Sequence, residues 1–290
     1  MCIRDRYKVA IIGNGMICNA AHIPAYKAMG DKVKIVAVAD IREEAAKETA
    51  ERHGIPKYYV DPYKMLEEEK PDIISVCTPN AYHKEYTLAG FRVGCHVVCE
   101  KPVAVTCADA EEMFNAAEKA GKHLFVIQSL RFTGNFKAAA GLAKSGCLGD
   151  IYYADLNLVR RRGVPRWGMF HMAKENVGGA FCDLGVHMCD YLMSISGNPK
   201  MVSVSGSAVT RIVNKEKNIE FSNAESGAPT GLFTPRKFDM KEFDVEEFAN
   251  GYIRLENGMT VTFKISWALN LPNSNTVSIC GDKGGLTIGD

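Results

Sequence analysis

Three side chains in this 290-residue sequence have the chemistry of a general acid–base site. Asp183 and His187 are four residues apart, so one face of a helix would carry both side chains. Lys101 follows the short apolar run His96–Cys99 and could give or take a proton at the end of that strand. Taken singly, a lysine beside a proline is typical of a solvated surface, and an Asp–His pair on a helix is more often a local ion pair. Asp190 also leaves the partner of His187 open.

A glycine-rich turn near the N-terminus predicts a dinucleotide site. The run Val9–Ile12 is short and β-branched, as is typical of a buried parallel strand, and it leads into Gly13-Asn14-Gly15. The first glycine can make a tight turn, and the second has no Cβ, so a pyrophosphate could approach the backbone. A helix beginning near Met16-Ile17 would direct free N–H groups at that pyrophosphate. Cys18 replaces the usual third glycine or alanine, but its thiol is small enough for close packing.

The residue that ends the next apolar run indicates which dinucleotide binds. Val33–Ala39 would complete a βαβ unit, and it is followed by Asp40, 27 residues after Gly13. A carboxylate there can accept hydrogen bonds from both hydroxyls of an adenosine ribose and would repel a 2′-phosphate. The sequence therefore favours NAD, although the nearby Arg42 leaves NADP possible.

Strands and helices alternate through the first half of the chain, which predicts a parallel sheet covered on both faces. Two polar turns, Thr78-Pro79-Asn80 and Glu100-Lys101-Pro102, follow the fourth and fifth strands, where doubly wound sheets bind ligands. His83 begins the helix after the first of these turns. After the two runs already described, the expected elements are helix 42–53, strand 58–60, a helix from 61, strand 73–77, helix 83–93, strand 96–99, helix 109–120 and strand 123–127. We expect residues 7–128 to form this Rossmann domain.

The pattern changes after Gln128 to long strands with few helices. We expect residues 129–290 to form a substrate-binding and oligomerisation domain with a large, mostly antiparallel open sheet. Glu256-Asn257-Gly258 is a hairpin turn signal, and residues 214–241 are expected to be a loop or sheet-edge insertion. The expected elements are helix 135–144, strand 151–159, loop 160–168, helix 179–196 and strands 201–210, 245–256, 259–267 and 276–281. The fold class is therefore α/β with two domains.

Composition excludes several classes of protein. With 47% hydrophobic residues, 24% charged residues and a net charge of +1, the chain gives no indication of a nucleic-acid or membrane partner. Its ten cysteines form no C-x-x-C pair, and alternation along a strand would separate Cys95, His96 and Cys99. We therefore expect no metal site, reduced thiols and a cytoplasmic location.

Both ends of the sequence look artificial. Residues 1–6 do not join the pattern of the first strand and are expected to be a non-native leader. The chain stops directly after the strand-like Gly284–Ile288, so we expect a fragment of a longer protein. A stop codon directly after Asp290 in the genomic sequence would refute this.

Four separated motifs together resemble one family. The turn at residues 13–15, Thr78-Pro79-Asn80 with His83, Glu100-Lys101-Pro102, and Gly178-Gly179 followed by Asp183-x-x-x-His187 occur in that order. The chain is similar to the glucose–fructose oxidoreductase, inositol dehydrogenase and rhizopine-catabolism family (Gfo/Idh/MocA). The resemblance runs from Tyr7 to the C-terminus, including the segment Phe243–Phe248 and the Gly281–Gly285 turn.

The resemblance implies roles for the chemically able residues. Lys101 would contact the reacting hydroxyl or carbonyl, and Glu100 would help to seat the nicotinamide. His187 would relay or donate the proton, while Asp183 would hold the substrate. From the residues alone, Arg160, Arg162, Arg166 and Trp167 lie in a loop that could close over a polyol, although its arginines could equally form a solvated or subunit-facing patch.

These expectations define an NAD(P)-dependent dehydrogenase or reductase that transfers hydride between a nicotinamide and a secondary hydroxyl or carbonyl of a sugar, cyclitol or related polyol. Two alternatives stay open. One is a glycoside hydrolase of the same family that oxidises its substrate transiently, and the other is a non-catalytic, regulatory NAD-binding protein. The resemblance also implies a homodimer or homotetramer formed through the C-terminal sheet.

Overall fold

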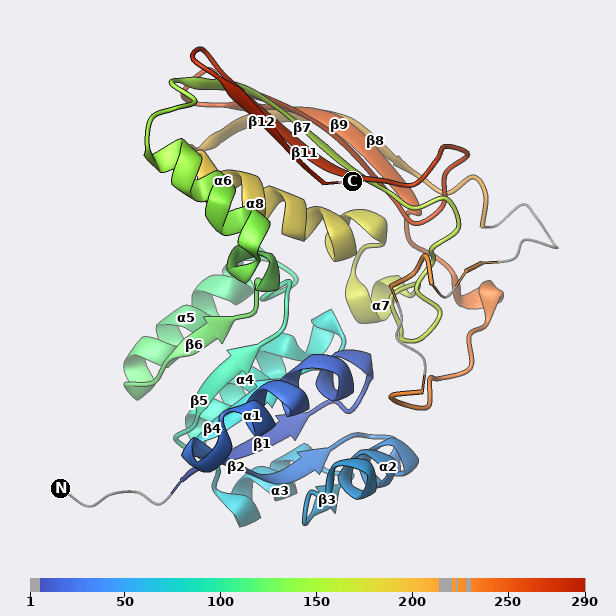
Figure 1. Cartoon of the computed structure of the whole chain (residues 1–290). Coiled ribbons are helices and arrows are strands. Elements are labelled where there is room, and N and C mark those ends of the chain that lie inside the picture. Colours follow the sequence, from blue (N-terminus) through green and yellow to red (C-terminus); the bar gives the residue numbers. More distant parts are fainter. Residues whose placement is uncertain (1–5, 214–220, 223, 228–230, 290) are drawn as a thin grey trace.

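Two six-stranded sheets make up the structure (Figure 1). The computed structural model describes residues 6–213, 221–222, 224–227 and 231–289. The first sheet contains strands between Tyr7 and Val126, and the second contains strands between Ile151 and Gly289. Apart from Arg6, the expected leader lies outside the described residues, as does part of the expected insertion at 214–241.

The first sheet is parallel throughout and has the order β3-β2-β1-β4-β5-β6. This order reverses between β1 and β4, and ligands bind beyond the carboxyl ends of strands at such a point. The strands are β1 (Tyr7–Ile12), β2 (Val33–Ala39), β3 (Tyr58–Tyr59), β4 (Ile73–Val76), β5 (His96–Cys99) and β6 (Leu124–Val126). The predicted Rossmann fold is confirmed.

Alternation along β1 explains how the two faces of this sheet are buried. Val9 and Ile11 pack into a cluster that includes Ile23 and Ala50, whereas Ala10 and Ile12 pack on the other face. All four β1 side chains are at most 1% exposed. The covering helices are α1 (Ile23–Ala28), α2 (Glu43–His53), α3 (Pro62–Glu69), α4 (His83–Arg92) and α5 (Cys107–Ala120).

Local signals in the sequence account for where these helices begin and end. Asp61 accepts a hydrogen bond from the backbone N–H of Tyr63 (2.8 Å) at the start of α3, and Thr106 caps α5 in the same way. Helix α2 ends at Gly54, whose φ of 65° lies in the left-handed region that favours glycine. Helix α5 therefore starts two residues before the predicted Asp109.

The helix after the glycine turn contains a π-helical turn. Helical backbone begins at Met16, as predicted, but residues Cys18–His22 form the wider turn, labelled η1, before α1. Pro24 has no N–H to donate to the preceding turn, and the N–H of Ile23 reaches back to the carbonyl of Cys18. As a result His22 faces inward and is only 7% exposed.

The second sheet is mixed, with the order β12-β11-β7-β10-β9-β8. Strand β10 runs parallel to β7, and every other neighbouring pair is antiparallel, so the predicted mostly antiparallel sheet is confirmed. The strands are β7 (Ile151–Val159), β8 (Met201–Val209), β9 (Phe248–Leu255), β10 (Thr260–Ser266), β11 (Ser274–Gly281) and β12 (Gly285–Gly289).

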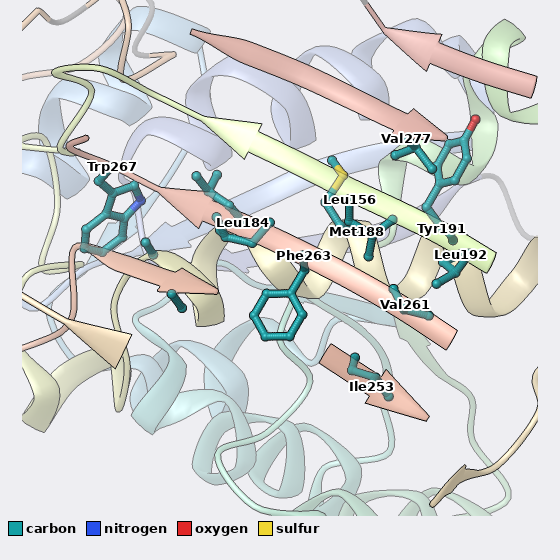
Figure 2. Packing of buried hydrophobic residues seen from close by; sticks show 14 of the residues in the cluster. Leu156, Leu184, Met188, Tyr191, Leu192, Ile253, Val261, Phe263, Trp267 and Val277 are labelled. Carbon is teal, nitrogen blue, oxygen red and sulfur yellow. The ribbon is translucent and has the colours of Figure 1, made fainter. Parts of the chain in front are cut away.

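Helices cover one face of the second sheet. In Figure 1, α6 (Gly134–Lys144) and α8 (Val186–Ile195) lie between this sheet and the first domain, and no helix of the described chain covers the opposite face. Figure 2 shows Leu156 of β7 near Met188 of α8, and Val277 of β11 beside Tyr191 of the same helix. None of the described helices is long and apolar enough to span a bilayer.

The helix predicted over 179–196 is interrupted. Residues Phe181–Gly185 form a second π-helical turn, labelled η5, and regular α-helix begins at Val186. The short helix α7 (Ala173–Asn176) was not predicted, because four residues carry no periodic pattern. The remaining short turns are 3₁₀-helical: η2 (Gly30–Lys32), η3 (Asn80–Tyr82), η4 (Ser129–Phe132) and η6 (Met240–Glu242).

Leu156 tests the core of the second domain. It is fully buried in β7, and Leu156→Ala should lower the free energy of unfolding by about 2–5 kcal/mol, because the deletion leaves a cavity. Tyr152 of the same strand is 57% exposed, so Tyr152→Ala should cost about 1 kcal/mol or less. Urea titration of both variants makes the measurement, and equal losses would contradict the assigned core.

Candidate active site

The glycine turn packs directly against the end of the neighbouring strand β4. Gly13 has a φ of 90°, and a Cβ on it would lie 2.5 Å from the carbonyl oxygen of Cys77. A side chain is therefore excluded at this position by both conformation and space. A Cβ on Gly15 would meet nothing within 4 Å. The backbone there is open on the side from which a pyrophosphate would approach, next to the helix that begins at Met16 and Ile17.

Asn19 holds this turn in place and was missed by the sequence analysis. Its buried amide donates to the carbonyls of Asn14 (3.0 Å) and Gly15 (2.9 Å), and its Oδ1 lies 3.0 Å from His53 Nε2 of α2. A polar residue among the buried positions of an apolar helix was the signal that could have found it.

Asp40 lies at the end of β2, as predicted, and organises the turn. Its Oδ2 accepts from the backbone N–H of Asn14 (2.8 Å), and its Oδ1 accepts from that of Arg42 (2.9 Å). A carboxylate can accept about four hydrogen bonds, so Asp40 retains capacity for ribose hydroxyls. The guanidinium of Arg42 lies 3.7 Å from Asp40 Oδ1.

The predicted cofactor-binding turn at Thr78-Pro79-Asn80 connects the two domains. Asn80 Nδ2 donates to the backbone carbonyl of Asn176 (3.1 Å) in the second domain. His83 is fully buried, with Nε2 2.9 Å from the carbonyl of Thr78 and Nδ1 2.8 Å from that of Pro102. Both ring nitrogens of His83 therefore contact backbone carbonyl groups, and the imidazole links the turns that follow β4 and β5.

Lys101 and Asp183 meet at the junction of the domains. Lys101 Nζ lies 2.9 Å from Asp183 Oδ1 and 3.0 Å from its backbone carbonyl. Both side chains are nearly buried, with exposed fractions of 16% and 12%. The structure thus brings together residues 82 positions apart, from the end of β5 and from the π-helical turn before α8.

Asp183 is an ionised carboxylate held from several sides. The indole N–H of the fully buried Trp267 donates to its Oδ2 (3.1 Å). Burial alone would raise the pKa of Asp183, but the charges of Lys101 and Arg160 outweigh burial and lower it below its usual range. Trp267 and Arg160 as partners of Asp183 carried no sequence signal, because each lies at the end of a strand distant in the chain.

A second carboxylate fixes the π-helical turn that carries Asp183. Glu246 accepts from the backbone N–H groups of Gly179 (2.7 Å) and Phe181 (2.9 Å), where a helix start favours negative charge. A Cβ on Gly179 would overlap the carbonyl oxygen of Glu246. The absence of a side chain at Gly179, one of the glycine pair predicted from the sequence, therefore allows the segment before β9 to pack closely against the start of this turn.

His187 is a neutral, largely buried imidazole. Burial, and then the charge of Lys101, lower its pKa to about 4, so near neutral pH it can accept a proton but not donate one. Within the described residues its buried Nδ1 has no hydrogen-bond partner. Asp183 binds Lys101 and Trp267 instead, and Asp190 forms an ion pair with Arg131, so the local Asp–His ion pair considered from the sequence is absent there.

The loop at residues 160–168, called the arginine loop, is hydrogen-bonded to Phe221 and Ser226. Arg166 donates to the carbonyl of Phe221 (2.8 Å), and the indole N–H of Trp167 donates to Ser226 (3.3 Å). Arg160 donates to the carbonyl of Ser226 (3.0 Å), and its charge acts on Asp183. Arg160 is therefore the arginine of this loop with an electrostatic link to the acid–base pair.

Chemically, this arrangement offers an ammonium, a carboxylate and a neutral imidazole beside a turn suited to a dinucleotide. Within the described residues, no group of three or more histidine, cysteine or acidic side chains is placed so that it could hold a metal ion.

Comparison with known proteins places the chain in one family of enzymes. Residues 7–128 match the model for an oxidoreductase family with an NAD-binding Rossmann fold, and residues 136–287 match the GFO/IDH/MocA C-terminal domain. The chain is 35% identical to D-glucoside 3-dehydrogenase of Escherichia coli (strain K12), over 97% of this chain and 76% of that protein. It is 30% identical to myo-inositol 2-dehydrogenase of Thermotoga maritima, over 66% of this chain and 55% of that protein.

Solved structures share the fold at lower sequence identity. GenD2 from gentamicin A biosynthesis, in complex with NAD, superposes with a TM-score of 0.81 at 21% identity, covering 100% of this chain and 74% of that one. Levoglucosan dehydrogenase, in complex with NADH, has a TM-score of 0.79 at 22% identity, covering 98% and 73%. With two matched domains and a relative that aligns with 97% of this chain, the chain belongs to the GFO/IDH/MocA family of NAD-binding oxidoreductases.

Proposed function

We propose that this protein is an NAD-dependent dehydrogenase that oxidises a secondary hydroxyl of a sugar, with the C3 hydroxyl of a D-glucoside as the first candidate. The contact between Lys101 Nζ and Asp183 carries the proposal, because it places an acid–base group of the first domain on a carboxylate of the second. The choice of sugar is supported by the 35% identity to a protein named D-glucoside 3-dehydrogenase.

The residues around the glycine turn fit the cofactor. The open backbone at Gly15 and the helix that starts at Met16 would hold the pyrophosphate, and Asp40 would bind the adenosine ribose. Thr78, Glu100 and the backbone near Lys101 lie at the same carboxyl edge and would face the nicotinamide half. When bound, NAD accepts the hydride from the substrate carbon.

Lys101 and its neighbours would handle the hydroxyl proton. A charged lysine has three N–H donors, and two of those in Lys101 are directed at Asp183, which leaves one for the substrate oxygen. Asp183 holds the ammonium in position, and Trp267 holds Asp183. A charged Lys101 has no lone pair to accept the hydroxyl proton, so neutral His187 would be its acceptor, while Lys101 would stabilise the negative charge on the substrate oxygen. His83 joins the supporting turns and is assigned a positioning role rather than contact with the cofactor.

We also propose that the chain forms a homodimer or homotetramer through the second sheet. The face opposite α6 and α8 carries Tyr153, Tyr252 and Thr262, whose aromatic and hydroxyl groups are common at protein interfaces.

Cofactor binding can be tested at the two glycines. Gly15→Ala should leave folding unchanged, since its Cβ meets no protein atom, and should weaken NAD binding by about tenfold or more, equal to about 1.4 kcal/mol. Gly13→Ala should destabilise the protein even without cofactor, because its Cβ overlaps the end of β4. Calorimetric titration with NAD and thermal unfolding separate these effects, and tight NAD binding by Gly15→Ala would reject the assigned pyrophosphate site.

The acid–base assignment is tested at Lys101. Lys101→Ala should retain NAD binding and lose about 10²–10⁴-fold in kcat, the range typical of a general acid or base. NADH formation from methyl glucosides, other sugars and inositols gives the measurement, with the exposed Lys64→Ala as control. Full turnover by Lys101→Ala would overturn the mechanism, whereas glycoside cleavage without lasting NADH would indicate the hydrolase alternative.

The assembly is tested on the uncovered sheet face. Light scattering after size-exclusion chromatography should give two or four copies, and Tyr252→Asp should shift the protein toward one, because it buries a charge in the interface. Tyr58→Asp, at an exposed position of the first domain, is the control. A monomeric wild-type protein would refute this proposal.

A further inference from the structure

A chain of buried polar side chains runs through the first domain and ends beside Lys101. Tyr26 Oη lies 2.7 Å from Ser75 Oγ, which lies 3.2 Å from His22 Nδ1. His22 Nε2 lies 2.8 Å from Glu100 Oε1. All four residues are at most 8% exposed, so this is an interior network of hydrogen bonds.

The protons of the network can be assigned from its chemistry. Burial is the main cause that raises the pKa of Tyr26 to about 12, so its hydroxyl stays protonated and can donate to Ser75. Ser75 can then donate to His22 Nδ1, and His22 Nε2 can donate to Glu100. Every donor in the chain has an acceptor, and the chain ends on a carboxylate.

Glu100 receives a second hydrogen bond on its other oxygen. Its Oε2 accepts from the backbone N–H of Lys101 at 3.2 Å, so the carboxylate joins His22 to the residue that contacts Asp183. Burial alone would raise the pKa of Glu100, but the hydrogen bond from His22, together with the charge of Lys101, lowers it. The titratable groups that interact with Glu100 are those of His22, Cys77, His83, Cys99, Lys101 and His187.

The π-helical turn is what directs His22 to this place. Residues Cys18–His22 form the wide turn, and Pro24 prevents a regular α-helix from continuing through it. Single π-helical turns inside helices occur frequently at functional sites. Here the turn sits in the helix that follows the glycine-rich loop and directs an imidazole toward the end of β5.

We propose that His22 is a positioning residue for the reaction: with Ser75 hydrogen-bonded to its other ring nitrogen, it holds the carboxylate of Glu100 in place and thereby fixes the backbone of Lys101. The inference rests on the proposed role of Lys101. It adds a residue from the helix after the glycine-rich loop, 79 positions before Lys101, that touches neither substrate nor hydride.

His22→Ala and His22→Gln test the proposal together. The alanine variant should lose about 10- to 100-fold in kcat, the range found for residues that orient metal ligands, with a smaller change in KM for the sugar. The acidic limb of its pH–rate profile should move to higher pH. Without the hydrogen bond from His22, burial would raise the pKa of Glu100. Glutamine can still donate to Glu100 and should recover most of kcat.

Two further variants separate positioning from folding. Ser75→Ala removes the partner of Nδ1 and should shift the same limb by a smaller amount, which decides the question if His22→Ala does not fold. His96→Gln is the matched control. His96 is the first residue of β5, so it lies at the amino end of the strand, whereas Glu100 follows the carboxyl end. The control should match the wild type in kcat and in pH profile.

The outcomes also distinguish this inference from the proposed function. An unchanged acidic limb in the folded His22 and Ser75 variants would overturn the positioning role. If Lys101→Ala is inactive while His22→Ala matches the wild type, the proposed function stands and this inference fails. If Lys101→Ala is fully active, the proposed function fails, whatever the His22 variants show.

Discussion

The ion pair between Lys101 and Asp183 is the interaction on which the rest of this site depends. It joins the carboxyl edge of the first sheet to the π-helical turn that precedes α8. Removing two charges from water is costly, and the cost is offset only when other hydrogen bonds complete the pair. Here the indole of Trp267 and the backbone carbonyl of Asp183 complete it. The pair is therefore a specific link between the domains as well as a candidate acid–base group.

Other polar contacts, between the domains and within the second domain, fix the position of this pair. Asn80 binds Asn176, and within the second domain Glu246 binds the start of the turn that carries Asp183. Apolar packing is nearly non-directional, so the clusters on either side of each sheet can bring the elements together without fixing an atom to a fraction of an ångström. Hydrogen bonds are directional, and those made by the buried carboxylates and amides fix the positions of these atoms.

The sequence predicted the elements that local rules control. Alternating apolar strands and helices indicated the Rossmann sheet, and glycine or aspartate positions marked the ends of α2 and the start of α3. The expected motif residues Lys101 and Asp183 do lie together. The register of the second sheet, with β10 parallel to β7, was not predictable, because it depends on pairing between strands about a hundred residues apart.

By itself, then, the sequence determined the order of elements, the glycine turn and the set of chemically able residues, since each follows from neighbours along the chain. Only the tertiary structure decided their partners. In the folded protein Asp183 forms an ion pair with Lys101 rather than with His187, and Trp267 donates a hydrogen bond to the same carboxylate. A π-helical turn places His22 in contact with Glu100. The physical reason is that a buried polar group takes whichever partner the packing brings within about 3 Å, and packing joins segments that no local pattern connects.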